Sequence, residues 1–162
     1  MAVNHPADHA FFAVLNEVGI IEQLARNAFE AAQEDGLALS HFIVLNHLTR
    51  VGDGANPARM ANALQLAKGA ITNTVARLEA RGLVRVKPDP RDRRGKQVWL
   101  TKAGRARREA AITAALGALH ASGVVLTGNE ASALLEPLRA LRKRLDAARD
   151  RATVPSPGRR PE

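Results

Sequence analysis

Residues 87–100 read KPDPRDRRGKQVWL, and this stretch decides the fold that the sequence predicts. Just before it, Val84 and Val86 alternate with Arg85 and Lys87. At its end, Val98 and Leu100 alternate with Gln97 and Trp99, so both segments have the two-residue period of a β-strand. The residues that favour a turn lie between the two strands: Pro88, Asp89, Pro90 and Gly95. Four cationic residues lie in the same region: Arg91, Arg93, Arg94 and Lys96. The sequence therefore predicts a β-hairpin over about 84–100 that holds positive charge out on its turn.

A helix is predicted immediately before the hairpin, over residues 68–80. Ile71, Val75 and Leu78 recur at the three- and four-residue spacing of a single helical face. The residues left facing outward are small or polar: Lys68, Gly69, Thr72, Asn73, Ala76 and Arg77. Helix, strand, basic turn and strand is the element order of a winged helix-turn-helix.

Helices are also predicted over most of the chain before residue 68. The first covers about 8–32, and its apolar stripe consists of Phe11, Phe12, Leu15, Val18, Ile21, Leu24, Ala25 and Ala28. Ser40 is placed to cap a second helix, and Asn56 and Pro57 to open a short third one that ends near Leu64. Only Gln65 and Leu66 lie in the connection to the next helix, so the two helices must cross steeply.

Two long helices are predicted after the hairpin. Thr101 can cap a helix over about 102–122, and Thr127 with Glu130 forms the capping-box pattern of a last helix. Pro137 falls inside the last helix and is expected to kink it. The leucines of this helix are spaced as a seam for another helix: Leu134, Leu138, Leu141 and Leu145. Residues 150–162 have no apolar period and are predicted to be a flexible tail.

Charge is concentrated in one part of the chain. The 162 residues carry a formal net charge of +8, and residues 68–108 alone contain thirteen Lys or Arg and three Asp or Glu. A positive region of this kind favours a polyanionic partner. An anionic membrane surface would suit the charge equally, but no apolar run approaches the roughly 18 residues that a spanning helix needs. With no signal-peptide pattern and no cysteine, we expect a soluble, cytoplasmic protein without disulfides.

The predicted helix and hairpin carry the chemistry that double-stranded DNA requires. An α-helix fits the major groove, where Thr72 and Asn73 can address base edges while Lys68 and Arg77 reach phosphates. Gly69 is small enough to let the backbone approach the duplex. Arginines on a narrow turn suit the negative potential of the minor groove. Each pattern also has an alternative interpretation when it is taken alone. The helix would be an ordinary solvent-exposed amphipathic helix, and the hairpin would be an exposed hairpin that its charges keep soluble.

Three sequence motifs resemble the MarR family of bacterial transcription regulators. They are ANALQLAKGAITNTVARLEARGLV at 61–84, DPRDRR at 89–94 and VWLTKAG at 98–104. The resemblance follows the element order over about 11–149 and is specific mainly over 57–104. It implies a mainly α fold with a small β-wing: a winged helix-turn-helix over 37–100, with recognition helix 68–80 and wing 84–100. The flanking helices, 8–36 and 101–149, would then form a dimerisation domain.

The resemblance also implies roles for individual residues. An Asp–Arg pair should brace the wing, with Asp89 and Asp92 as the candidate acids, while Arg93 or Arg94 enters the minor groove. The dimer interface would include Phe11, Leu15 and the leucine seam of the last helix. A small anionic aromatic effector often binds in the crevice between the domains of this family, and His41 and Phe12 are candidates to line it.

The function predicted is a dimeric repressor, without a cofactor, that an aromatic or phenolic effector releases from a pseudo-palindromic operator. Its two recognition helices would enter major grooves about one helical turn apart, 10–10.5 bp. No catalytic arrangement is evident, so we do not expect an enzyme, and the five histidines form no compact metal-ligand set. The alternative is a winged-helix adaptor that uses the same charged face to bind an acidic protein rather than DNA.

Overall fold

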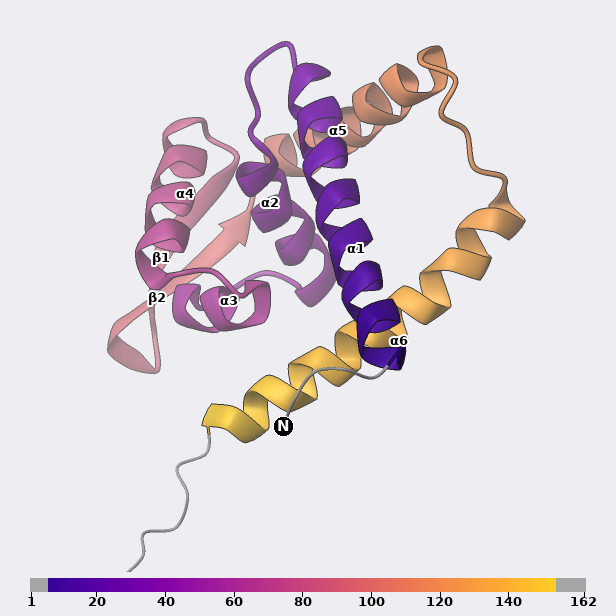
Figure 1. Cartoon of the computed structure of the whole chain (residues 1–162). Helices are drawn as coiled ribbons and strands as arrows, with labels where there is room; N and C mark the ends of the chain where they lie inside the picture. Colours follow the sequence, from indigo (N-terminus) through magenta and orange to yellow (C-terminus); the bar gives the residue numbers. More distant parts are fainter. Residues whose placement is uncertain (1–5, 154–162) are drawn as a thin grey trace, which may run out of the picture. The chain divides into compact units, whose positions relative to one another are not determined.

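The computed structural model describes residues 6–153, except for the side chains of residues 6, 93, 94, 152 and 153. The elements, shown in Figure 1, are α1 (Pro6–Ala31), α2 (Leu39–Val51), α3 (Pro57–Leu64), α4 (Lys68–Ala80), β1 (Val84–Asp89), β2 (Asp92–Leu100), α5 (Lys102–Ala121) and α6 (Gly128–Thr153). The chain divides into two units after Ser122. The predicted class, mainly helical with a two-stranded wing, is confirmed.

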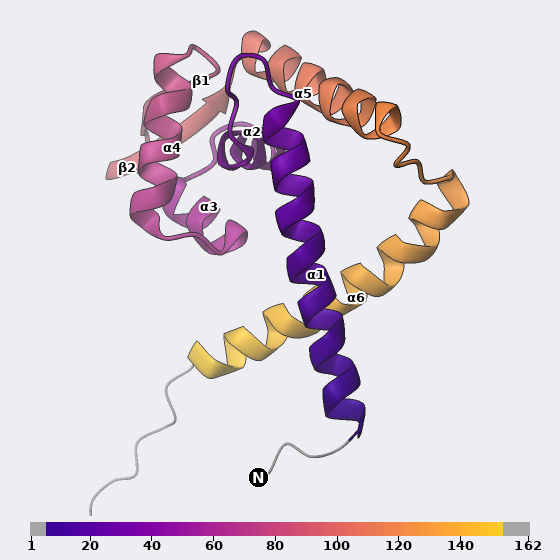
Figure 2. The ribbon, with the colours of Figure 1, turned by 45° about the horizontal axis from the view of Figure 1, so that its top comes forward.

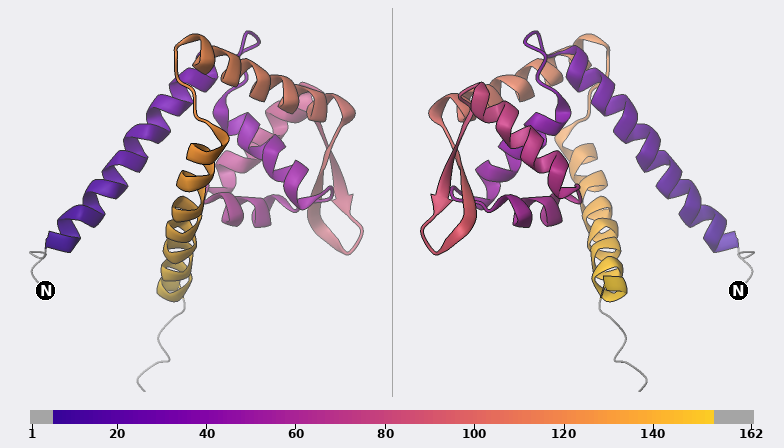
Figure 3. Two further views of the ribbon diagram at one scale, coloured as in Figure 1. Left: turned by 90° about the vertical axis from the view of Figure 1, so that its right-hand side faces the viewer. Right: turned by 90° about the vertical axis from the view of Figure 1, so that its left-hand side faces the viewer.

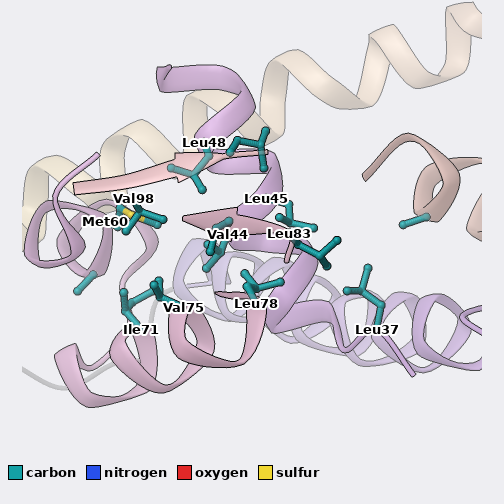
Figure 4. Close-up of a cluster of buried hydrophobic side chains, with 14 of the residues drawn as sticks. Leu37, Val44, Leu45, Leu48, Met60, Ile71, Val75, Leu78, Leu83 and Val98 are labelled. Carbon is teal, nitrogen blue, oxygen red and sulfur yellow. The ribbon is translucent and has the colours of Figure 1, made fainter. Parts of the chain in front are cut away.

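The core of the first unit lies beneath α4. Ile71 and Leu78 are completely buried and Val75 nearly so, as their spacing predicts. Around them are apolar side chains from α2, α3 and β2, among them Val44, Leu45, Met60 and Val98 (Figure 4). Burying a side chain of this size stabilises the fold by about 1.5–3 kcal/mol. This core fixes which face of α4 points outward.

Local capping groups fix both ends of α3, and the second of them begins the tight turn into α4. The Asn56 side chain accepts hydrogen bonds from the amides of Ala58 (2.8 Å) and Arg59 (3.3 Å), and Pro57 occupies the first turn. Gln65 adopts the left-handed conformation, with φ of 56°, and ends the helix. Figure 2 shows the steep crossing of α3 and α4 that this short connection produces.

The start of α2 differs from the prediction. Ser40 lies inside the helix, and the capping position is Ala38, which makes no side-chain bond. The carboxylate of Glu30, on α1, accepts the amide of Leu39 at 2.8 Å instead. The predicted Ser40 cap is therefore wrong, because a side chain from another helix satisfies the first amide of α2.

The hairpin is antiparallel, with Val86 opposite Val98 and Pro88 opposite Lys96. A bulge follows, after which Asp89 stands opposite Asp92. The turn itself therefore contains only residues 90 and 91, so Arg93 and Arg94 lie in β2 rather than in the turn. Figure 3 shows the hairpin extending beyond the helices of its own unit.

Helix α5 packs with the winged helix-turn-helix, whereas the sequence prediction grouped it with the last helix. Ala111 is completely buried in the core of the first unit. A Cβ at Gly104 would lie 2.0 Å from the Leu83 carbonyl oxygen, so only glycine permits this approach. Thr101 caps α5 as predicted, since its Oγ1 accepts the Gly104 amide at 2.9 Å.

The second unit consists mainly of α6. Its capping box forms as predicted: Glu130 Oε2 accepts the Thr127 amide at 2.8 Å, and Thr127 Oγ1 accepts the Glu130 amide at 3.2 Å. The helix continues through Pro137 and runs to Thr153. Residues 150–153 of the predicted tail are therefore helical, and residues 154–162 lie outside the described part of the chain.

Candidate nucleic-acid interface

The outward face of α4 is exposed and polar. It contains the residues predicted to contact DNA: Lys68, Gly69, Thr72, Asn73 and Arg77, all of them exposed. The Thr72 hydroxyl donates to the Lys68 carbonyl at 3.0 Å, which leaves its oxygen able to accept. No side chain caps the start of α4 at Ala67, so the first amides stay open to an external acceptor.

The tip of the wing is held by Asp89. Its Oδ1 accepts the backbone amide of Arg91 at 2.9 Å, which fixes the turn. A Cβ at Gly95 would lie 2.9 Å from the Cβ of Asp89, so the close packing of the two strands here requires glycine. Arg91 and Lys96 are exposed. The predicted Asp–Arg brace and the insertion of Arg93 or Arg94 involve side chains outside the described part, and they stay predictions.

The wing and α4 border the same groove, which has a volume of about 540 Å³. The start of α3 forms its third wall. The cationic and polar residues that line it are Asn56, Lys68, Thr72 and Lys96, and the acids are Glu79 and Asp92. A nucleic-acid partner that contacts α4 would therefore also meet the wing.

Contacts around Trp99 hold the base of the wing. The Lys87 Nζ lies 5.0 Å from the centre of the indole ring, a cation–π contact on the other strand. The loop residues Gly54 and Ala55 bond to β2. The Gly54 amide donates to the Val98 carbonyl at 3.0 Å, and the Ala55 carbonyl accepts the Val98 amide at 2.9 Å. The loop between α2 and α3 thus pairs with β2 and limits how far the wing can tilt.

An ion-pair network fixes the far end of α4. Asp35 pairs with Arg81, at the end of α4, and with Arg107 on α5. The Gln33 side chain accepts from Arg107 Nη2 at 2.9 Å and donates to the Phe29 carbonyl at 3.1 Å. The hydrogen bond from Arg107 is the main reason that the pKa of Asp35 falls from 3.8 to about 2. No periodic signal in the sequence indicates this network.

The two candidate effector residues lie in different surroundings. Phe12 is 71% exposed on α1, whereas His41 is buried in α2. Burial and then the charges of Arg81 and Arg77 lower the pKa of His41 below its usual 6.5. Neither residue lines the three described cavities. The structure of the single chain does not bring them into one pocket, so an effector site at these residues stays a prediction.

The predicted dimerisation residues expose apolar surface in both units. On α1 this surface comes from Phe11, Phe12, Val14, Leu15, Val18, Ile20, Ile21 and Leu24. On α6 it comes from Leu134, Leu135, Leu138 and Leu145, and Leu141 is half-buried. Apolar patches of this extent mark interaction surfaces. Within residues 6–153 no cluster of three metal-binding side chains is found, and no helix has the length and apolarity to cross a membrane.

Comparisons with known proteins agree with this architecture. Residues 35–95 match the family described as the MarR family. The transcriptional activatory protein BadR of Rhodopseudomonas palustris is 33% identical over 101 residues, which cover 61% of this chain and 56% of BadR. The chain thus spans little more than half the length of this relative.

Solved structures share the fold over most of the chain. BldR of Sulfolobus solfataricus aligns with a TM-score of 0.73 and 24% identity, over 87% of this chain and 99% of that one. A MarR-family regulator of Rhodococcus sp. RHA1 aligns with a TM-score of 0.68 and 25% identity, over 85% of this chain and 95% of that one. BpsR of Bordetella bronchiseptica, whose DNA binding is regulated by 6-hydroxynicotinic acid, aligns with a TM-score of 0.59 and 27% identity. The alignment covers 78% of this chain and 98% of BpsR.

The fold and the exposed polar helix beside a wing define a winged helix-turn-helix protein. Over residues 35–95 the chain matches the MarR family of transcriptional regulators, and its fold is that of the solved MarR-family regulators.

Proposed function

We propose that this protein is a homodimeric DNA-binding regulator that places α4 in the major groove and the wing in the adjacent minor groove. One observation carries the proposal: α4 exposes Lys68, Thr72, Asn73 and Arg77 while a buried core holds its inner face. A helix held in this way can present side chains to base edges without losing its own packing.

The roles of the α4 residues follow from their chemistry. The Asn73 amide makes no hydrogen bond within the described residues, so it is available to pair with the donor and acceptor of an adenine edge. Thr72 can contact a base through its oxygen or its methyl group. Lys68 and Arg77 would neutralise phosphates, which set affinity and register rather than sequence choice.

The wing would add a second contact in the minor groove. Arg91 and Lys96 are exposed near its tip, and Arg93 and Arg94 follow the turn in β2. A guanidinium in a narrow minor groove benefits from the enhanced negative potential there. We assign this role to Arg93 or Arg94.

Dimerisation would cover the exposed apolar side chains of α1 and, separately, those of α6. A homodimer would present two copies of α4 to half-sites one helical turn apart, 10–10.5 bp, on a pseudo-palindromic operator. The cytoplasm is the compartment where such a protein would meet DNA.

A small aromatic acid would control binding. The regulation of BpsR by 6-hydroxynicotinic acid supports this class of effector, and His41 and Phe12 are the residues that we assign to its pocket. The effector must bind the DNA-free arrangement more tightly than the DNA-bound one, since only such a difference shifts the equilibrium. We propose repression; because BadR is named an activatory protein, a promoter–reporter assay should score both directions.

A gel-shift assay with random-sequence duplex at two salt concentrations tests the proposal. We expect retardation at low salt that weakens at high salt. The slope of log K against log salt concentration should be about −0.9 per phosphate neutralised. Fragments of the source genome would then identify the operator by tighter binding. Failure to retard any duplex at either salt concentration would overturn the proposal in favour of an adaptor that binds an acidic protein.

A further inference from the structure

The wing has only two strands, so each outer edge must be satisfied from elsewhere. Val86 stands opposite Val98, and the Val98 amide and carbonyl bond to Ala55 and Gly54 rather than to β1. In an antiparallel ladder, such a pair exchanges no hydrogen bonds. The Val86 amide therefore points away from β2, toward the free edge of β1.

Glu79, on α4, satisfies this edge. Its Oε1 accepts the Val86 amide at 2.8 Å. The next residue of β1 with the same orientation is Pro88, which has no amide hydrogen to satisfy. Within the described part of the chain, the Glu79 carboxylate is thus the side chain that hydrogen-bonds the outer edge of β1 to α4.

Asp53 satisfies the corresponding position on β2. Its Oδ1 accepts the Leu100 amide at 2.9 Å, and its Oδ2 pairs with Arg105 Nη2 at 2.8 Å. Asp53 lies in the loop between α2 and α3, so this bond joins the other side of the wing to the helix-turn-helix.

We infer that Glu79 and Asp53 are positioning residues that fix the wing relative to α4, so that one rigid unit can read two neighbouring grooves. A hairpin of two strands is marginally stable alone, whereas bonds to carboxylates are about twice as strong as neutral ones. Glu79 is also an acid in the most cationic part of the chain, where its charge opposes phosphate binding. The inference rests on the proposed function.

Amide hydrogen exchange of the free protein tests, without DNA, the bond from the Val86 amide to Glu79, which we call the tether. Glu79→Ala should speed amide exchange at Val86 and across residues 91–96 by roughly tenfold or more, because a lost bond to a charged group costs that much. Glu79→Gln keeps an oxygen acceptor without the charge, so its exchange should lie between that of the wild type and that of Glu79→Ala. Glu79→Met keeps the length without such an oxygen and serves if the alanine variant does not fold. Glu34→Ala removes an exposed acid elsewhere and is the charge control.

Selection from a pool of random duplexes tests how the tether affects the recognition of DNA sequence by the wing. The expected result is that Glu79→Ala and Asp53→Ala lose sequence preference in the flanks beneath the wing and keep it in the half-site core. Glu79→Gln should restore part of the flank preference. The inference is overturned if exchange in Glu79→Ala equals that of the wild type, or if core and flank preferences fall together. If the wild type itself selects no duplex, the proposed function fails, and the exchange result still decides whether the tether exists.

Discussion

Helices α4 and α1 both expose side chains to solvent, but the exposed side chains differ in chemistry. On α4 the exposed residues are small, polar or charged, and the large apolar ones, Ile71, Val75 and Leu78, are buried within the same chain. On α1 the exposed residues include Phe12, Ile21 and Leu24, which are 71%, 59% and 63% exposed. Both helices are long enough to contact a partner along several turns.

This difference indicates which kind of partner each helix can bind. The inner face of α4 is satisfied within one chain, so its outer face is free to bind a charged partner such as DNA. The apolar face of α1 leaves large side chains in water, each of which gains about 1.5–3 kcal/mol on full burial. A second copy of the chain is the partner that we propose for α1.

The largest expected effect comes from placing charge on the α1 face. Ile21→Glu combined with Leu24→Glu should convert the dimer to a monomer at micromolar concentrations, because the interface would bury unpaired carboxylates. Sedimentation equilibrium measures the change in mass. The matched control, Asn62→Glu with Ala63→Glu on the exposed face of α3, should stay dimeric. A double variant on α1 that keeps the mass of the wild type would show that α1 does not form the interface.

A smaller effect is expected in the core beneath α4. Leu78→Ala should lower the free energy of unfolding by about 2–5 kcal/mol, since it leaves a cavity in a completely buried site. Denaturant titration of the monomeric background from the preceding experiment measures this. In that background Phe12→Ala should change stability by no more than about 0.5 kcal/mol, because its side chain is exposed. Equal losses in the two variants would remove the distinction between the helices.

Much of this architecture is predictable because it depends on local patterns. The bounds of α4, its buried residues, the caps at Asn56 and Thr101 and the strand positions of the wing follow from periodicity and capping chemistry. Binding roles remain predictions, because a pattern shows which face is exposed and not what covers it.

Contacts between side chains and distant backbone escape such patterns. Glu30 replaces the predicted Ser40 cap, and Asp53 accepts an amide 47 residues away. The wing turn is also shorter than expected, because the bulge beside Pro88 pairs Asp89 with Asp92. The Glu30 and Asp53 bonds depend on tertiary contacts that only the folded chain brings together, and the shorter turn depends on a change of strand register that the periodic pattern does not show.

A modest effect is expected from a phosphate-directed lysine on α4. Lys68→Ala should weaken binding to all duplexes about equally and reduce the slope of log K against log salt by about one. Fluorescence anisotropy at four salt concentrations measures this. Lys143→Ala, an exposed lysine in the second unit, is the control and should leave the slope unchanged. A loss confined to one duplex sequence would instead make Lys68 a base-reading residue.

The smallest effect concerns pH. Burial lowers the pKa of His41 and of His47 in the folded chain, so the unfolded chain binds protons first as the pH falls through 6.5. The free energy of unfolding should therefore be fully retained above about pH 7 and decline toward pH 5. Thermal melts at pH 7.5, 6.5 and 5.5 measure this. His41→Asn with His47→Asn should flatten the dependence, and an unchanged dependence would assign it to other groups.

Operator binding by the Asn73→Ala and Arg94→Ala variants tests the central claim, that α4 and the wing form one DNA-reading surface, most directly. Anisotropy titration should give wild-type protein tight, sequence-dependent binding, and each variant a loss of at least about 1–3 kcal/mol, with the dimer intact by sedimentation. Wild-type affinity in both variants would contradict the claim and remove this face of the protein from DNA recognition.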